Sequence, residues 1–219
     1  MSKLRCHISM SLDGFVAGPD QSAENPLGVG GEQLHDWVVP LAAFREAHGE
    51  QGGEVNASTP VFQEATANIG AAVMGRGMFG PIGGGDWSDD EKWTGWWGDN
   101  PPYHYPVFVV THHRRDPVEM AGGTTYHFVT DGIESALARA REAAGDGEIS
   151  IQGGADTINQ YLAAGLVDEL RLHIVPFTLG AGSRLFDGVP ALNLEQVYAR
   201  TASTVIHATY RVHGTLPAR

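Results

Sequence analysis

The chain has 219 residues, 42% of them hydrophobic, which suffices for one substantial buried core. Its 14 Lys and Arg side chains against 26 Asp and Glu side chains give a formal net charge of −12 at pH 7. This charge repels phosphate backbones and anionic lipids, and the basic residues are scattered, so neither nucleic acid nor a membrane is expected as a partner.

The single cysteine, Cys6, excludes an internal disulfide, and no apolar stretch approaches the roughly 18 residues of a membrane-spanning helix. We therefore expect a cytoplasmic protein. A chain of this length is commonly one domain, and we expect residues 1–219 to form one, with loop-rich insertions near 18–58 and 80–106.

The first elements are predicted by hydrophobic periodicity. Apolar and polar residues alternate from Leu4 to Met10, which predicts a strand that ends at the turn Asp13-Gly14. Within residues 18–58, apolar residues at helical spacing predict one helix inside a loop-rich segment. These apolar residues are Leu34, Trp37, Val38, Leu41 and Phe44.

The middle of the chain alternates between clear elements and a long loop. Ser58 or Thr59 can cap a helix that begins at Pro60 and ends near Asn68, and a short strand over 71–74 follows. Residues 80–106 contain Gly83-Gly84-Gly85, several prolines and four tryptophans, so we expect mainly loop there.

Strands and helices alternate in the second half. Strands are predicted over 107–110, 126–129, 148–151 and 170–175, with a last strand over 204–212. Helices are predicted over 131–144, with Asp131 and Glu134 at capping-box spacing, and over 155–164. This order predicts an α/β fold with a central, mostly parallel mixed sheet, helices on both faces and an antiparallel C-terminal edge.

Three predicted strand ends carry groups suited to an anionic ligand. Gly153-Gly154 precedes a helix N-terminus, where free amides favour a pyrophosphate, although a tight turn alone would also explain two glycines. Gly75 and Arg76 follow another strand, and an arginine there suits a phosphate monoester or is a plain surface residue. Residues 111–115 combine hydroxyl, imidazole and guanidinium groups at a third strand end.

Other candidate positions have two interpretations each. The adjacent pair His112-His113 lacks the partner spacing of a metal site, and no metal is expected. Asp13 either caps the first strand in an Asp-Gly turn or orients a substrate. The tryptophan-rich loop either stacks on a planar heterocycle or belongs to the core.

Several motifs together resemble the RibD C-terminal domain, a dihydrofolate-reductase-like family. The N-terminal motifs lie in residues 9–17, 74–79 and 109–111, and the C-terminal ones in 151–154, 162–170 and 176–186. The resemblance implies a mixed sheet with flanking helices, NADPH bound at its strand ends, and hydride transfer to a C=N bond. The substrate class it implies is a pterin-like or ribosylaminopyrimidine-like heterocycle, and it also suggests a homodimer.

The resemblance assigns roles by position. Ala17 would contact the nicotinamide end, Gly75 and Arg76 the adenosine phosphate region, and Asp13 the substrate side as the candidate catalytic group. Thr111, with His112 or Arg114, would bind the ribose phosphate. The segment that would hold the pyrophosphate consists of Gly153, Gly154, Ala155 and Asp156.

The chain departs from the family pattern in one respect. The acidic residue of true dihydrofolate reductases on the first helix has no secure counterpart, and Glu32 and Asp36 are only candidates. Two alternatives to the NADPH-dependent reductase therefore stay open: a non-catalytic nucleotide-binding protein of the same fold, and a flavin-dependent reductase.

Overall fold

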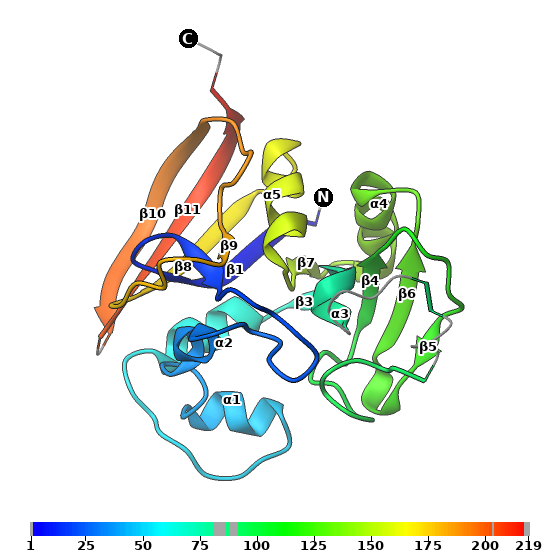
Figure 1. Cartoon of the computed structure of the whole chain (residues 1–219), viewed down its shortest axis with the longest axis horizontal. Helices are drawn as coiled ribbons and strands as arrows, with labels where there is room; N and C mark the ends of the chain where they lie inside the picture. The colour runs from blue at the N-terminus through cyan, green and yellow to red at the C-terminus, as the bar shows by residue number, and fades with distance from the viewer. Residues whose placement is uncertain (1, 81–85, 88–91, 203, 217–219) are drawn as a thin grey trace.

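The structure is a computed structural model that describes residues 2–80, 86–87, 92–202 and 204–216 (Figure 1). Its centre is a nine-stranded sheet with the strand order β10-β11-β8-β1-β7-β3-β4-β6-β5. Adjacent strands from β8 to β6 in this order are parallel. They are β1 (Leu4–Ser11), β3 (Ile69–Gly75), β4 (Pro106–Val110), β6 (Thr125–Val129), β7 (Glu148–Ile151) and β8 (Glu169–Val175).

Both edges of the sheet are antiparallel. On one side β11 (Val205–Thr215) pairs with β8 and with β10 (Leu192–Ala202), and on the other β5 (Val118–Glu119) pairs with β6. A separate two-stranded sheet joins β2 (Phe15–Ala17) to β9 (Ser183–Arg184). The predicted α/β fold with a mostly parallel mixed sheet and an antiparallel C-terminal edge is confirmed.

Helices cover both faces of the sheet, as predicted. The helices α4 (Ile133–Ala144) and α5 (Ala155–Ala163) pack on the apolar face through the largest core cluster, which contains Leu4, Cys6 and Ile149. Burial raises the pKa of the Cys6 thiol to about 12, which fits a structural rather than a reactive cysteine. The opposite face is covered by α1 (Ala42–Ala47) and α2 (Thr59–Thr66), which lie on the lower side in Figure 1.

The remaining helical segments are short. They are the 3-10 turns η1 (Gly31–His35) and η2 (Ala121–Gly123) and the single turn α3 (Arg76–Phe79). Within the described ranges, no helix is both long and apolar enough to cross a bilayer.

Two predicted details of these elements are wrong. The one helix expected from Leu34 to Phe44 is divided into η1 and α1, and Pro40 lies between them, where proline disfavours a continuous helix. The capping box at α4 is absent, because the Asp131 carboxylate accepts hydrogen bonds from Ser135 and Arg139 instead. The last strand predicted over 204–212 is found as β11, and the sequence analysis missed its hairpin partner β10.

Part of the tryptophan-rich insertion lies outside the described residues, including Gly83-Gly84-Gly85. In the described part, Trp87 is 5% exposed and belongs to a second core cluster with Phe79, Tyr126 and Phe128. Trp93 packs against the same cluster, and its indole N–H donates to the Phe79 carbonyl at 2.8 Å. These tryptophans therefore hold the loop against the β4–β6 end of the sheet.

Candidate functional site

The glycine turn after β7 lies directly against the end of β3. Because both strands are parallel, their carboxyl ends reach the same edge of the sheet. The Gly75 amide donates a hydrogen bond to the Gly153 carbonyl at 2.8 Å, and the Gly153–Gly154 peptide is cis. Gly153 has a φ of 102°, which side chains other than glycine rarely adopt. Two of the predicted strand ends are thus brought together.

Space at this edge is limited on one side and open on the other. A Cβ atom at Gly75 would lie 2.2 Å from Thr157 Oγ1, whereas one at Gly154 would meet no atom within 4 Å. Gly154 precedes the first residue of α5, Ala155, and contributes no capping side chain. The amides of the first turn of α5 are therefore available to an anionic ligand, although the exposed Asp156 adds a negative charge there.

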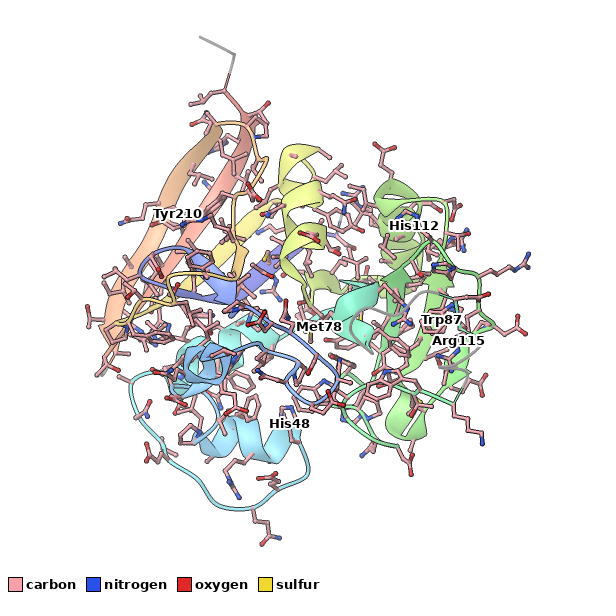
Figure 2. All side chains as sticks on the ribbon, viewed as in Figure 1. His48, Met78, Trp87, His112, Arg115 and Tyr210 are labelled. Atoms are coloured by element: carbon pink, nitrogen blue, oxygen red, sulfur yellow. The ribbon has the colours of Figure 1, made fainter. Side chains whose placement is uncertain are left out.

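Two arginines from different strand ends contact one indole. The Arg76 guanidinium lies 3.7 Å from the centroid of the Trp87 ring, and that of Arg115 lies 4.8 Å from it. Arg76 also donates to the Gly80 carbonyl, and the Trp87 indole N–H donates to the His113 carbonyl at 2.8 Å. We call Arg76, Trp87 and Arg115 the arginine–tryptophan cluster; Figure 2 shows Trp87 beside Arg115.

Of this cluster, the sequence predicts only Arg76 as a phosphate-binding residue. At the third strand end the sequence predicts this role for Arg114, whereas the structure shows that Arg115 contacts the indole. The signal for Trp87 was the abundance of tryptophan in the loop, which did not distinguish a core residue from a ligand contact. The structure shows that Trp87 is buried and that its ring also contacts the guanidinium groups of Arg76 and Arg115.

The residues after β4 surround a cavity of about 310 Å³ at the ends of β4 and β6. Its lining includes Arg114, Arg115, Thr130, Asp131 and Arg139. Thr111 is 5% exposed, and its hydroxyl accepts a hydrogen bond from the His113 amide at 3.2 Å, so this side chain shapes the turn. His112 and Arg114 are exposed. Of these three predicted positions, only Arg114 lines the cavity, whose lining holds two further arginines and the carboxylates of Asp116 and Asp131.

Asp13 connects the end of β1 to the loop after β8. Its carboxylate accepts hydrogen bonds from the Ser11 hydroxyl at 2.6 Å and from the amides of Leu179 and Gly180 at 3.1 and 2.7 Å. The Ser11 hydroxyl, followed by the backbone amides, lowers the pKa of Asp13 to about 2. At neutral pH the side chain is a carboxylate and cannot donate a proton. Its predicted catalytic role stays a prediction.

Replacing Asp13 with asparagine is expected to lower the stability of the chain, because the amide cannot accept from all three donors. Since the folded-state pKa is depressed, the contribution of the carboxylate is present above the unfolded pKa and is lost as pH falls toward 2. Thermal unfolding of D13N and of the unaltered chain at pH 7 and pH 3 measures this. The two chains should differ most at pH 7, and the difference should be smaller at pH 3, where part of the contribution of the carboxylate has been lost. An effect no larger than that of D146N, at an exposed aspartate, would contradict the prediction.

The other predicted acids do not reach the sheet. Glu32 and Asp36 lie in and after η1 and are exposed. Ala17 lies in β2 and is buried, next to the connection that Asp13 makes. Neither Glu32 nor Asp36 therefore supplies a buried acid for proton donation.

A row of buried histidines was missed by sequence reasoning. His173 in β8 and His207 in β11 are in register with each other and with Ser9 in β1, on the face covered by η1 and α2. His173 and His207 are 2% and 1% exposed. His7, also on this face, packs edge-on against His173. The alternation of polar and apolar residues in these strands resembles that of a solvent-exposed face, which concealed the row.

These histidines predict a loss of stability in mild acid. Burial lowers the pKa of His7 and His207 to about 4 and holds that of His173 well below its usual value. Their neutral forms therefore stabilise the fold fully above about pH 6.5, and this contribution falls as pH drops toward 4. As pH falls from about 6.5 toward 4, each such histidine lowers the free energy of unfolding by about 1.4 kcal/mol per pH unit. Urea unfolding at pH 7, 6 and 5 measures this slope, which H112Q should leave intact and H207Q should reduce.

The fold and the glycine-lined sheet edge define an α/β protein of the dihydrofolate-reductase-like class. The family model of the RibD C-terminal domain matches residues 2–208, and the chain belongs to this family. The family predicted from the sequence motifs is therefore confirmed. Among curated proteins, YyaP of Bacillus subtilis strain 168, which is uncharacterized, is 37% identical over 89 residues. That match spans 40% of this chain and about half, 47%, of YyaP.

Solved structures share the fold. A protein from Shewanella sp. PV-4 named for riboflavin biosynthesis is 21% identical with a TM-score of 0.62, covering 97% of this chain and 99% of that chain. A deaminase/5-amino-6-(5-phosphoribosylamino)uracil reductase from Thermotoga maritima is 13% identical with a TM-score of 0.58, covering 96% and 56%. The riboflavin biosynthesis reductase Rib7 of Saccharomyces cerevisiae is 14% identical with a TM-score of 0.52, covering 96% and 88%.

Proposed function

We propose that the chain is an NADPH-dependent reductase that transfers a hydride to a C=N bond of a small, pterin-like or ribosylaminopyrimidine-like heterocycle. Membership of the RibD C-terminal family supports the reductase class, and the related structures named as reductases support the substrate class. The observation that carries the proposal is the contact between Gly75 and Gly153. It places a phosphate-suited glycine turn next to the first arginine of the arginine–tryptophan cluster.

The residues at this edge suit a dinucleotide phosphate. Beside Gly154 there is room for a ligand, and the amides of Ala155 and its neighbours begin α5, so this turn would hold the pyrophosphate. Arg76 and Arg115 would bind the 2′-phosphate that distinguishes NADPH from NADH. The remaining proposed cofactor contacts are Ala17 at the nicotinamide end and Thr111, His112 and Arg114 beside the ribose phosphate.

The cofactor, when bound, supplies the hydride, so the chain has to align donor and acceptor and provide a proton. Ala17 in β2 and the residues at the end of β1 would bound the reacting end of the site. Asp13 would act there by fixing the end of β1 rather than by donating a proton, since its carboxylate already accepts three hydrogen bonds.

Separate titrations of the purified chain with NADPH and NADH test the proposal. Binding of NADPH should quench tryptophan fluorescence, because Trp87 lies between the proposed phosphate ligands. Turnover is measured as loss of reduced-nicotinamide absorbance with a 7,8-dihydropterin and with 5-amino-6-(5-phosphoribosylamino)uracil as probes. Binding of NADPH without oxidation by either probe would favour the non-catalytic alternative. Binding of a flavin but of neither nicotinamide would favour the flavin-dependent one.

A further inference from the structure

Three adjacent strands place Ser9, His173 and His207 in one row across the polar face of the sheet (Figure 1). The Trp37 indole covers the row: its ring centroid lies 4.6 Å from that of His173 and 4.9 Å from that of His207. The Trp37 N–H donates to the Ser9 hydroxyl at 2.9 Å. The histidines are thus enclosed between the sheet and the insertion that precedes α2.

The two imidazoles belong to a hydrogen-bonded chain. His173 Nδ1 and His207 Nδ1 are 2.9 Å apart, and His207 Nε2 lies 3.1 Å from the hydroxyl of Ser58. With both rings neutral, one proton occupies the link between the Nδ1 atoms, so one ring donates and the other accepts. The direction of that bond fixes the direction of the Ser58 bond and the protonation of His173 Nε2. The proton between the two Nδ1 atoms, the proton of the Ser58 bond and the protonation of His173 Nε2 therefore change together.

His173 Nε2, at the inner end of the chain, is buried and has no hydrogen-bond partner among the described residues. Leaving a buried polar atom unsatisfied is costly, so its retention calls for an explanation. In the part of the chain that the structure describes, no group of three or more ligating side chains could hold a metal ion. The arrangement suits a hydrogen-bonding partner that enters from outside the protein.

The surroundings keep both rings neutral. Burial is the largest cause that disfavours an imidazolium at either ring, and the cationic side chains of Arg171 near His173 and Arg200 near His207 add to it. The nearest acid on this strand, Glu169, is engaged by Arg171 at 2.6 Å. A buried proton donor in these surroundings has to pass on a proton without holding a positive charge.

We propose that the chain Ser58–His207–His173 is a proton relay, and that His173 Nε2 donates the proton that accompanies hydride transfer. This role rests on the proposed reductase function. It fills the position for which neither Asp13 nor the exposed Glu32 and Asp36 qualifies. In this relay His173 would be the catalytic residue, because its Nε2 would contact the substrate nitrogen, and His207 and Ser58 would be positioning residues that act through it.

The step balances with a proton from water. Bound NADPH would supply a hydride to the substrate carbon, and the π electrons of the C=N bond would move to nitrogen. That nitrogen takes the proton of His173 Nε2, while His173 Nδ1 takes that of His207 Nδ1. His207 Nε2 takes the hydroxyl proton of Ser58, which is 2% exposed, so water has to reach this hydroxyl through an opening of the segment that covers it to return the proton. One hydride and one proton are consumed. Both rings stay neutral but end in the opposite tautomers, and the protons have to shift back along the two rings before the next turnover.

The position of the relay fits the cofactor edge. His173 lies two residues before the end of β8 at Val175, roughly 7 Å along the strand, and β8 pairs with β1 up to Ser11. His173 is 2% exposed beneath the Trp37 indole, so a heterocycle at the carboxyl ends of these strands reaches His173 Nε2 only when that indole moves aside. The hydride donor and the proton donor would then approach the substrate from the edge and the polar face of the same sheet.

The test compares S58A, S58T and T66A in the full chain. S58A removes the outer hydroxyl of the relay, S58T keeps a hydroxyl, and T66A removes a hydroxyl of the same helix that bonds to the Phe62 carbonyl instead. With 7,8-dihydropterin and NADPH, kcat of S58A should fall by about 100-fold, the lower end of the roughly 10²- to 10⁴-fold that general acid catalysis contributes, because Ser58 acts only through His207. Its solvent deuterium isotope effect should change, while NADPH affinity stays constant. S58T and T66A should resemble the unaltered chain.

A second measurement tests the protonation pattern of the relay in the absence of turnover. Nitrogen-15 NMR of histidine-labelled protein should show one Nδ1-protonated and one Nδ1-unprotonated ring for the pair, and H207F should abolish this pattern. Two Nε2-protonated rings would overturn the relay. So would S58A with unaltered kcat and isotope effect in a chain that oxidises NADPH. Failure of the unaltered chain to oxidise NADPH with either probe would instead overturn the proposed function, and the relay with it.

Discussion

Replacing Arg76 with alanine is expected to weaken NADPH binding by about 1.5 to 3 kcal/mol and to leave NADH binding nearly unchanged. Only NADPH carries the 2′-phosphate, and a charged hydrogen-bonded contact to it is worth roughly this much. The indole of Trp87 fixes the Arg76 guanidinium at 3.7 Å, so little side-chain freedom is lost on binding. Fluorescence titration with the two nucleotides measures the difference, about 10- to 150-fold in Kd for NADPH.

Two further variants test whether the loss of NADPH affinity is specific to the arginine–tryptophan cluster. R115A should show a loss of the same kind, because Arg115 contacts the same indole from the next strand end. R45A serves as the control, since Arg45 lies on α1 and pairs with Glu50 at 3.0 Å. Equal losses for NADPH and NADH in R76A would remove Arg76 from the 2′-phosphate and limit it to a structural role at the loop.

Replacing Gly75 with alanine is expected to destabilise the fold by about 1 to 3 kcal/mol, the usual cost of overpacking a filled site. The backbone of Gly75, with φ −81° and ψ 160°, accepts any residue, so the cost is purely steric. The new Cβ would lie 2.2 Å from Thr157 Oγ1, and α5 would have to move away from β3. NADPH affinity should fall with stability, because the amides proposed to bind the pyrophosphate begin α5. Urea unfolding and the NADPH titration measure both effects.

The chain contains a matched control for this variant. A Cβ at Gly77 meets no atom within 4 Å, and alanine favours a helical position, so G77A should be neutral or slightly stabilising. Adding T157A to G75A removes the 2.2 Å contact and leaves one of 3.3 Å to the Thr157 Cβ, so stability should partly return. A G75A chain as stable as G77A would show that the two elements are not tightly packed.

The parallel strands and the glycine turn were predictable because their signals are local. The short apolar runs that became β3, β4 and β7 are each followed within two residues by a glycine or a threonine. Parallel strands bring such ends to one edge, so the grouping of Gly75 with Gly153 follows from the fold class. The direct hydrogen bond between these two residues required coordinates.

The features that sequence reasoning missed depend on long-range pairing. Register shifts between Leu192 and Leu194, and again between Gln196 and Tyr198, interrupt the period of two in β10 and concealed that strand. His173 and His207 are 34 positions apart and meet only because β8 and β11 are neighbours. Trp87 and Arg115 are likewise far apart in sequence, because the loop before β4 and β4 itself lie between them. No local periodicity encodes these contacts.

The cover over the polar sheet face and the glycine-lined edge come from separate stretches of the chain. Residues 18–58 supply η1, Trp37, α1 and Ser58, the residue that precedes α2, whereas the edge is formed after residue 74. This separation would let the two halves of the proposed site change independently. Exchange of residues 18–58 between family members is then expected to alter the proposed substrate side and to leave the proposed nucleotide contacts in place.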